Sequence, residues 1–156
     1  MRRLRLGEWI AALAGVGLIV SLTLDWYGVR GRATGISGFA AFDVIDLLLV
    51  LVAAMGIALA IIQATRDRPA LPVAAAVLTV TAGFLGTLLV LYRIVNEPGP
   101  DDFIEVRAGA YLGLLAAAAL TAGGWLSLAD EHVPGLPPGP EPELRPAPRI
   151  AADAEP

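Results

Sequence analysis

Five ionisable residues are the side chains of this sequence most able to do chemistry, because they stand at the edges of long apolar stretches. We name Asp25, Asp46, Arg93, Glu105 and Arg107 the charged cluster. An ionisable group turned inward at that depth is costly unless it is paired or hydrated. Because arginine can hold carboxylates with its fork of donors, the sequence predicts a direct Arg93–Asp46 contact, with Asp25 as alternative or additional partner. Two interpretations stay open: a ligand- or ion-binding pocket, or an ion pair that fixes helix register.

A second motif, Gly35-Ile36-Ser37-Gly38, spells the GxSG sequence of rhomboid-type intramembrane serine proteases. Such a site needs a histidine base on a neighbouring membrane helix. The only histidine, His132, follows the last apolar stretch and is predicted on the opposite side of the membrane. We therefore interpret the glycines as turn residues and His132 as a solvated interfacial residue.

The composition supplies few other parts for a reaction centre. Cysteine is absent, which excludes disulfides, thiolate metal sites and a cysteine nucleophile. The sequence contains no phosphate-binding loop, dinucleotide fingerprint or metal-ligand motif. We expect no catalytic, cofactor-binding or metal site, and hence no enzyme.

The elements that must position the charged cluster are strongly hydrophobic. Hydrophobic residues make up 56% of the 156 residues and charged residues 17%, whereas a soluble domain carries about a quarter charged residues. The net charge of −4 argues against nucleic-acid binding, which needs a basic surface. These values predict a protein of the lipid bilayer.

Four apolar stretches, residues 9–24, 44–64, 70–95 and 106–128, organise the chain. A bilayer core of about 30 Å needs roughly 20 helical residues, and the last three stretches reach that length. We expect the first to be a retained helix rather than a cleaved signal peptide. The predicted fold is an all-α membrane protein, an antiparallel bundle of four transmembrane helices over residues 1–129, with 28–38 as a flexible loop and 96–105 as a polar loop.

The last segment, 130–156, is rich in proline and is predicted to be a disordered cytoplasmic tail. With four spans, both chain ends share one side of the membrane. The N-terminus and the 65–69 turn carry five arginines, Arg2, Arg3, Arg5, Arg66 and Arg68, against Arg30, Arg32, Arg93 and Arg107 on the other side. The positive-inside rule then predicts a cell-membrane protein with both termini cytoplasmic.

Aromatic side chains are predicted to mark the two membrane interfaces. Trp9 and Trp125 stand at one end of the apolar stretches. At the other end stand Trp26, Tyr27, Tyr92 and Tyr111. Amphipathic aromatic rings favour the headgroup level.

Small and polar residues recur at alternating three- and four-residue spacing on each stretch, and we call each such row a seam. Small residues let helices approach closely in lipid, so the seams predict one compact bundle. The seams are Glu8, Ala11, Gly15, Leu18, Leu22 and Asp25; Asp46, Leu49, Ala53, Gly56, Ala60 and Gln63; Pro72, Ala76, Thr79, Gly83, Gly86, Val90 and Arg93; and Ala110, Gly113, Ala117, Leu120 and Gly124.

Several short motifs resemble a recurring type of small actinobacterial membrane protein. These are Leu24-Asp25-Trp26-Tyr27, the stretch 38–46, Leu91-Tyr92-Arg93, the stretch 109–113, and Gly123-Gly124-Trp125. In that type the first helix ends in a Pro-Trp-Tyr-like sequence, and this chain has Asp25 in place of the proline. The resemblance implies four membrane helices and no assigned activity, and it supplies no catalytic residue. Arginine as the sole basic residue agrees with a bacterial source.

Two functions from different classes follow as expectations. The first is a non-enzymatic accessory or scaffold bundle that acts by contact with a membrane-protein partner or with a second copy of the chain. The second is a small-molecule, lipid or ion binding or transport subunit that uses the charged cluster.

Overall fold

Four long helices make up most of the structure, a computed structural model that describes residues 4–42, 44–65, 70–97 and 103–130. They are α1 (Leu6–Thr23), α3 (Ile45–Thr65), α4 (Ala70–Val95) and α5 (Ala108–Asp130). Each is long and apolar enough to cross a membrane, which confirms that prediction. The helix α1 begins earlier than expected because the Glu8 carboxylate accepts the Arg5 backbone N–H at 2.8 Å and so satisfies a donor at the helix start. The predicted tail beyond Asp130, with His132, lies outside the described residues, as do Asp43 and 66–69.

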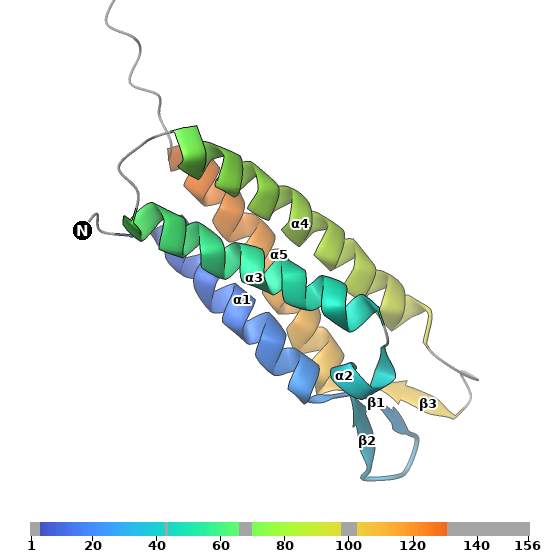
Figure 1. The fold of residues 1–156 in the computed structure, drawn as a ribbon. Helices are drawn as coiled ribbons and strands as arrows, with labels where there is room; N and C mark the ends of the chain where they lie inside the picture. Colours follow the sequence, from blue (N-terminus) through green and yellow to red (C-terminus); the bar gives the residue numbers. More distant parts are fainter. Residues whose placement is uncertain (1–3, 43, 66–69, 98–102, 131–156) are drawn as a thin grey trace, which may run out of the picture.

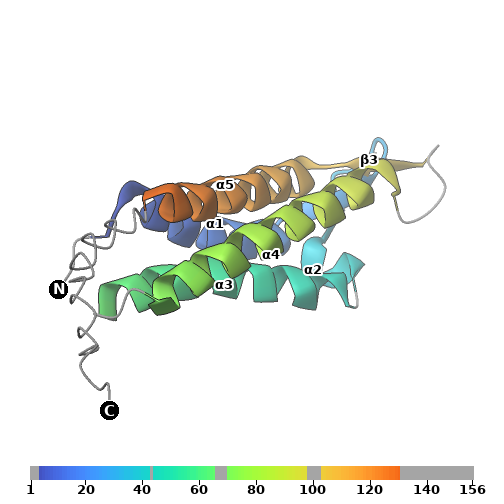
Figure 2. The ribbon, with the colours of Figure 1, turned by 90° about the horizontal axis from the view of Figure 1, so that it is seen from above.

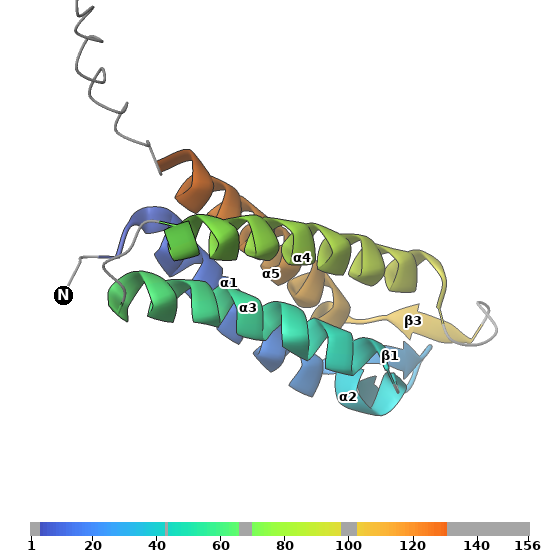
Figure 3. The same ribbon diagram turned by 45° about the horizontal axis from the view of Figure 1, so that its top comes forward.

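The four helices lie side by side, and α1 and α4 each run antiparallel to α3 and α5 (Figure 1). Helix α1 packs against α3 and α5, and α4 packs against the same two helices. Figure 3 places α3 and α4 in front of α1 and α5. The start of α1 and the end of α5 therefore lie at one end of the molecule.

Close backbone approach holds the helices together along the predicted seams. A methyl group placed on Gly15 would lie 2.6 Å from the Ala53 carbonyl oxygen, and one on Gly56 would lie 2.6 Å from the Ala11 carbonyl oxygen. On α4, Gly83 faces Thr121 in the same way, at 2.8 Å from its hydroxyl oxygen. These distances leave no room for a side chain. Every seam residue whose burial the structure describes is buried or half-buried except Asp25, which confirms the seams.

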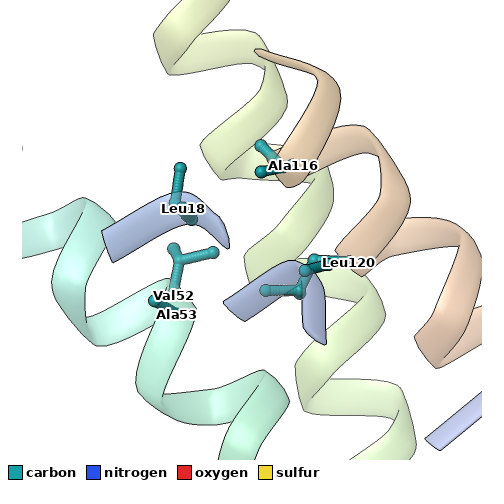
Figure 4. Close-up of a cluster of buried hydrophobic side chains, with 7 residues drawn as sticks. Leu18, Val52, Ala53, Ala116 and Leu120 are labelled. Carbon is teal, nitrogen blue, oxygen red and sulfur yellow. The ribbon is translucent and has the colours of Figure 1, made fainter. Parts of the chain in front are cut away.

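The middle of the core is built mainly from small and aliphatic side chains. Figure 4 shows Leu18 of α1, Val52 and Ala53 of α3, and Ala116 and Leu120 of α5 converging on one another. Leu18, Ala53 and Leu120 are fully buried. Thr87 and Thr121 add hydroxyl groups nearby, and each donates to a carbonyl four residues earlier in its own helix.

A small sheet covers one end of the helices, and this corrects the all-α prediction. Strands β1 (Asp25–Val29), β2 (Gly35–Ser37) and β3 (Ile104–Val106) form an antiparallel sheet in the order β2-β1-β3. The segments predicted as a flexible loop and a polar loop are thus hydrogen-bonded to each other. Gly31, with φ of 80°, allows the turn between β1 and β2. A short helix, α2 (Gly38–Ala41), follows β2.

The sheet lies at the end opposite to the start of α1 and the end of α5, and we call it the sheet end. Seen from above, β3 extends from the end at which α4 finishes and α5 begins (Figure 2). Trp26 and Tyr27 of β1 are 0% and 2% exposed, so these two aromatics form a core beneath the sheet and not the interfacial belt that was predicted. Tyr92 and Tyr111, at 57% and 55% exposed, do face outward at this end.

Candidate functional site

Arg107 is the centre of a polar network on the sheet. It stands between β3 and α5, where its backbone N–H donates to the Trp26 carbonyl at 2.8 Å. Its guanidinium forms ion pairs with Asp25 at 3.6 Å and with Glu105 at 3.2 Å. The same group donates to the Ala33 carbonyl at 2.9 Å and to the Arg32 carbonyl. One side chain therefore joins the β1–β2 hairpin to the segment that leads into α5.

Two glycines make room for this network. A methyl group on Gly28 of β1 would overlap the Arg107 guanidinium, and one on Gly35 of β2 would overlap the Asp25 carboxylate. The two glycines pair with each other across the strands. They allow the charged groups to lie flat on this face of the sheet. Gly35 is therefore a strand residue, which corrects its interpretation as a turn glycine.

Arg93 does not join this network, and its predicted ion pair is wrong. Both ion pairs among the described residues belong to Arg107, so neither Asp46 nor Asp25 pairs with Arg93. The Arg93 guanidinium carbon lies 4.7 Å from the centroid of the Phe42 ring instead. Its Nε atom is buried without a hydrogen-bond partner. Asp46, the predicted partner of Arg93, instead accepts a hydrogen bond from the backbone N–H of Leu47 at 2.7 Å.

The Phe42 ring beneath the Arg93 guanidinium belongs to a group of three aromatic rings. Phe42 meets Trp26 edge-on at 5.1 Å and Tyr27 edge-on at 6.0 Å between ring centroids. The Trp26 indole N–H donates to the Ser21 carbonyl at 2.7 Å, which fixes β1 to the end of α1. The Tyr27 hydroxyl donates to the Arg93 carbonyl at 2.8 Å. We call Trp26, Tyr27 and Phe42 the aromatic group.

The charge of the Tyr27 hydroxyl is set by this environment. Burial raises its pKa above the ordinary value of 10.0, while the nearby Arg93 charge lowers it and Glu97 raises it further. The hydroxyl is therefore neutral at physiological pH, and it offers no negative charge to Arg93.

The five residues of the charged cluster were predicted to form one site, but the structure places them in three separate locations. Asp25, Glu105 and Arg107 meet on the sheet, Arg93 lies over the aromatic group, and Asp46 stands apart at the start of α3. Sequence reasoning missed Phe42 and the burial of Tyr27. The run of aromatics around the predicted loop was the only signal for them.

A surface hollow of about 360 Å³ lies between α1 and α5. Its sole polar side chain, Ser21, donates its hydroxyl to the Leu18 carbonyl at 2.7 Å. Elsewhere the hollow is lined by small and apolar residues: Gly17, Val20, Leu24, Leu112, Leu115, Ala116 and Ala119. The hollow fits a hydrocarbon chain, but it has no polar side chain free to form a hydrogen bond with a ligand. Within the parts of the chain that the structure describes, no three acidic or histidine side chains are placed to hold a metal ion.

No protein-family description, curated protein or solved structure matches the chain. The resemblance to small actinobacterial membrane proteins therefore stays a prediction.

Proposed function

We propose that the chain is an integral protein of the cell membrane in which α1, α3, α4 and α5 form an antiparallel bundle of four spans. Both termini are cytoplasmic, and the sheet end faces outward. The apolar length of each helix supports this proposal. Exposed Trp9 and Trp125 at one end and exposed Tyr92 and Tyr111 at the other match two headgroup levels.

Within the membrane, the protein acts as a non-enzymatic accessory or scaffold that presents the sheet to a partner. The observation that carries this proposal is the Arg107 network, because one guanidinium fixes both segments of the sheet end in a single arrangement. A surface fixed in this way loses little conformational entropy on binding. Rigidity of this kind suits a contact surface.

The sheet end also exposes apolar side chains outside the four spans. Ile36 is 50% exposed on β2, Phe103 is 66% exposed beside β3, and Val29 is 44% exposed on β1. Lipid tails cannot cover residues beyond the membrane core. A membrane-protein partner, or a second copy of the chain, is the occupant we propose for this surface.

The alternative function, a binding or transport subunit that uses the charged cluster, has less support. The carboxylates of Asp25 and Glu105 are already engaged by Arg107. A transport site is ordinarily built near the bilayer midplane with broken helices, whereas the middle of this core is aliphatic.

Site-specific photocrosslinking in cells tests the scaffold proposal. A photoreactive residue at Ile36 or Phe103 should give a discrete crosslinked product, and Arg107→Gln should weaken it by loosening the sheet end. A probe at Leu51, which is 55% exposed on the lipid-facing side of α3, is the matched control. Equal crosslinking from Leu51, or none from the sheet end, would contradict the proposal.

A further inference from the structure

Arg93 forms no ion pair with any acid that the structure describes. It lies in the last turn of α4, with its Nε buried and unpaired. An ionised group near the end of a span is costly unless an anion or water compensates it. An anion or water outside these residues must therefore compensate the positive charge of Arg93.

The groups that face Arg93 do not supply this compensation. Tyr27 donates its hydroxyl hydrogen to the Arg93 carbonyl, and its hydroxyl also interacts with the Arg93 side chain through a hydrogen bond that lowers the Tyr27 pKa, but a neutral hydroxyl supplies no negative charge. Glu97 follows one turn later and acts electrostatically on Tyr27, but it forms no ion pair with Arg93. The two acids of the sheet, Asp25 and Glu105, are paired with Arg107.

Phe42 fixes the guanidinium in one place. A ring centroid 4.7 Å from the guanidinium carbon is within the range of a cation–π contact. Such a contact covers one face of the planar group, so a further ligand meets its edge, where Nε is buried and the Tyr27 hydroxyl lies close by. A fixed arginine fork fits the oxygens of a phosphate, which it can bind with two parallel hydrogen bonds.

The position of Arg93 relative to the exposed tyrosines indicates which kind of phosphate it meets. The preceding residue, Tyr92, is 57% exposed, and its hydroxyl accepts a hydrogen bond from Asn96 at 2.7 Å. Tyr111, at the start of α5, is 55% exposed at the same end. Exposed tyrosines with polar tips mark the headgroup level of a bilayer.

We propose that Arg93, held on the Phe42 ring, binds the phosphate group of a membrane phospholipid at the sheet end. This inference rests on the membrane insertion proposed above but not on the scaffold function. Failure of the crosslinking experiment would therefore leave it standing.

Lipid binding to the purified, delipidated protein in maltoside detergent tests the inference. The probes are phosphatidylglycerol, phosphatidylcholine and inorganic phosphate, and native mass spectrometry counts the lipids that remain bound. Both lipids should bind wild-type protein and raise its unfolding temperature. Arg93→Gln should weaken binding about tenfold, equivalent to about 1.4 kcal/mol.

Three further variants keep the test decisive. Arg32→Gln removes an exposed arginine at the same end and should bind lipid like the wild type. Arg93→Lys keeps the charge without the fork and should bind lipid with intermediate affinity, which serves if Arg93→Gln does not fold. Glu97→Gln should leave lipid binding unchanged or tighter.

Three results would overturn the inference. Equal lipid binding by wild type and Arg93→Gln would remove Arg93 from the site. Arg93-dependent stabilisation by inorganic phosphate but not by lipid would reject lipid as the source. Loss of binding in Glu97→Gln as large as in Arg93→Gln would show that the two residues act as an ion pair.

Discussion

Replacement of Arg107 by glutamine is the sharpest perturbation of the sheet end. The variant removes two ion pairs and two hydrogen bonds to backbone carbonyls, while the backbone N–H that bonds to Trp26 is kept. Because the Asp25 and Glu105 side chains are 47% and 39% exposed, each ion pair is worth at most about 1 kcal/mol. A charged donor to a carbonyl contributes about 1.5 kcal/mol, and glutamine can recover part of one such bond.

The expected loss is therefore about 2–3 kcal/mol in the local stability of the sheet. At 1.4 kcal/mol per factor of ten, amide hydrogen exchange in β1 and β3 should accelerate roughly 30- to 150-fold. The diagnostic amide is that of Arg30, which donates to the Phe103 carbonyl at 2.9 Å and so joins the two segments. Amides in the middle of α1 should exchange at the wild-type rate.

Arg32→Gln is the matched control, because Arg107 bonds to the backbone carbonyl of Arg32 and not to its side chain. That variant should leave exchange in the sheet unchanged. Wild-type protection of the Arg30 amide in Arg107→Gln would refute the view that Arg107 fixes the sheet end. Equal acceleration in both variants would show that total charge, and not the network, matters.

Two more predictions concern the core and the aromatic group. Gly83→Leu should lower the unfolding temperature in detergent, because overpacking there costs about 1–3 kcal/mol. Phe84→Leu, at an exposed site on the same helix, should not lower it. Equal effects of the two variants would place Gly83 against lipid. Burial raises the pKa of Tyr27 above 10.0, so the neutral hydroxyl contributes its full stability below pH 10. That contribution is lost as the pH rises through the folded-state pKa. Tyr27→Phe should therefore reduce the loss of stability at alkaline pH, while Tyr111→Phe should not. Unfolding temperatures measured from pH 8 to pH 11 check this, and an unchanged alkaline slope in Tyr27→Phe would contradict it.

The helices and their buried faces could be predicted because their signals are long and repetitive. Apolar runs fix the spans. On each helix a row of small residues repeats over several turns, with Gly15 in α1, Gly56 in α3 and Gly83 in α4, so the positions of one row support each other. Close approach in lipid needs small residues at those positions whatever the loops do. That part of the fold depends on local composition and helical period alone.

The sheet and its charge pairing could not be predicted, because both depend on contacts between distant segments. Strands of three to five residues are too short to show a period, and the glycines in them indicated a turn. The sequence led us to predict Arg93 as the partner of Asp46 or Asp25, whereas the β1–β3 register places Arg107 beside Asp25. Burial of Tyr27 and Phe42 beneath the sheet then gave Arg93 an aromatic neighbour in place of an acid.

The central claim, a four-span protein with the sheet end outside the cell, is tested most directly by cysteine labelling. Because the chain contains no cysteine, a single Arg32→Cys or Thr65→Cys variant carries one thiol at a known end. A membrane-impermeant maleimide should label Arg32→Cys in intact cells and Thr65→Cys only after the membrane is permeabilised. Labelling of Thr65→Cys in intact cells, with Arg32→Cys protected, would contradict the proposed orientation, and labelling of both would contradict the four spans.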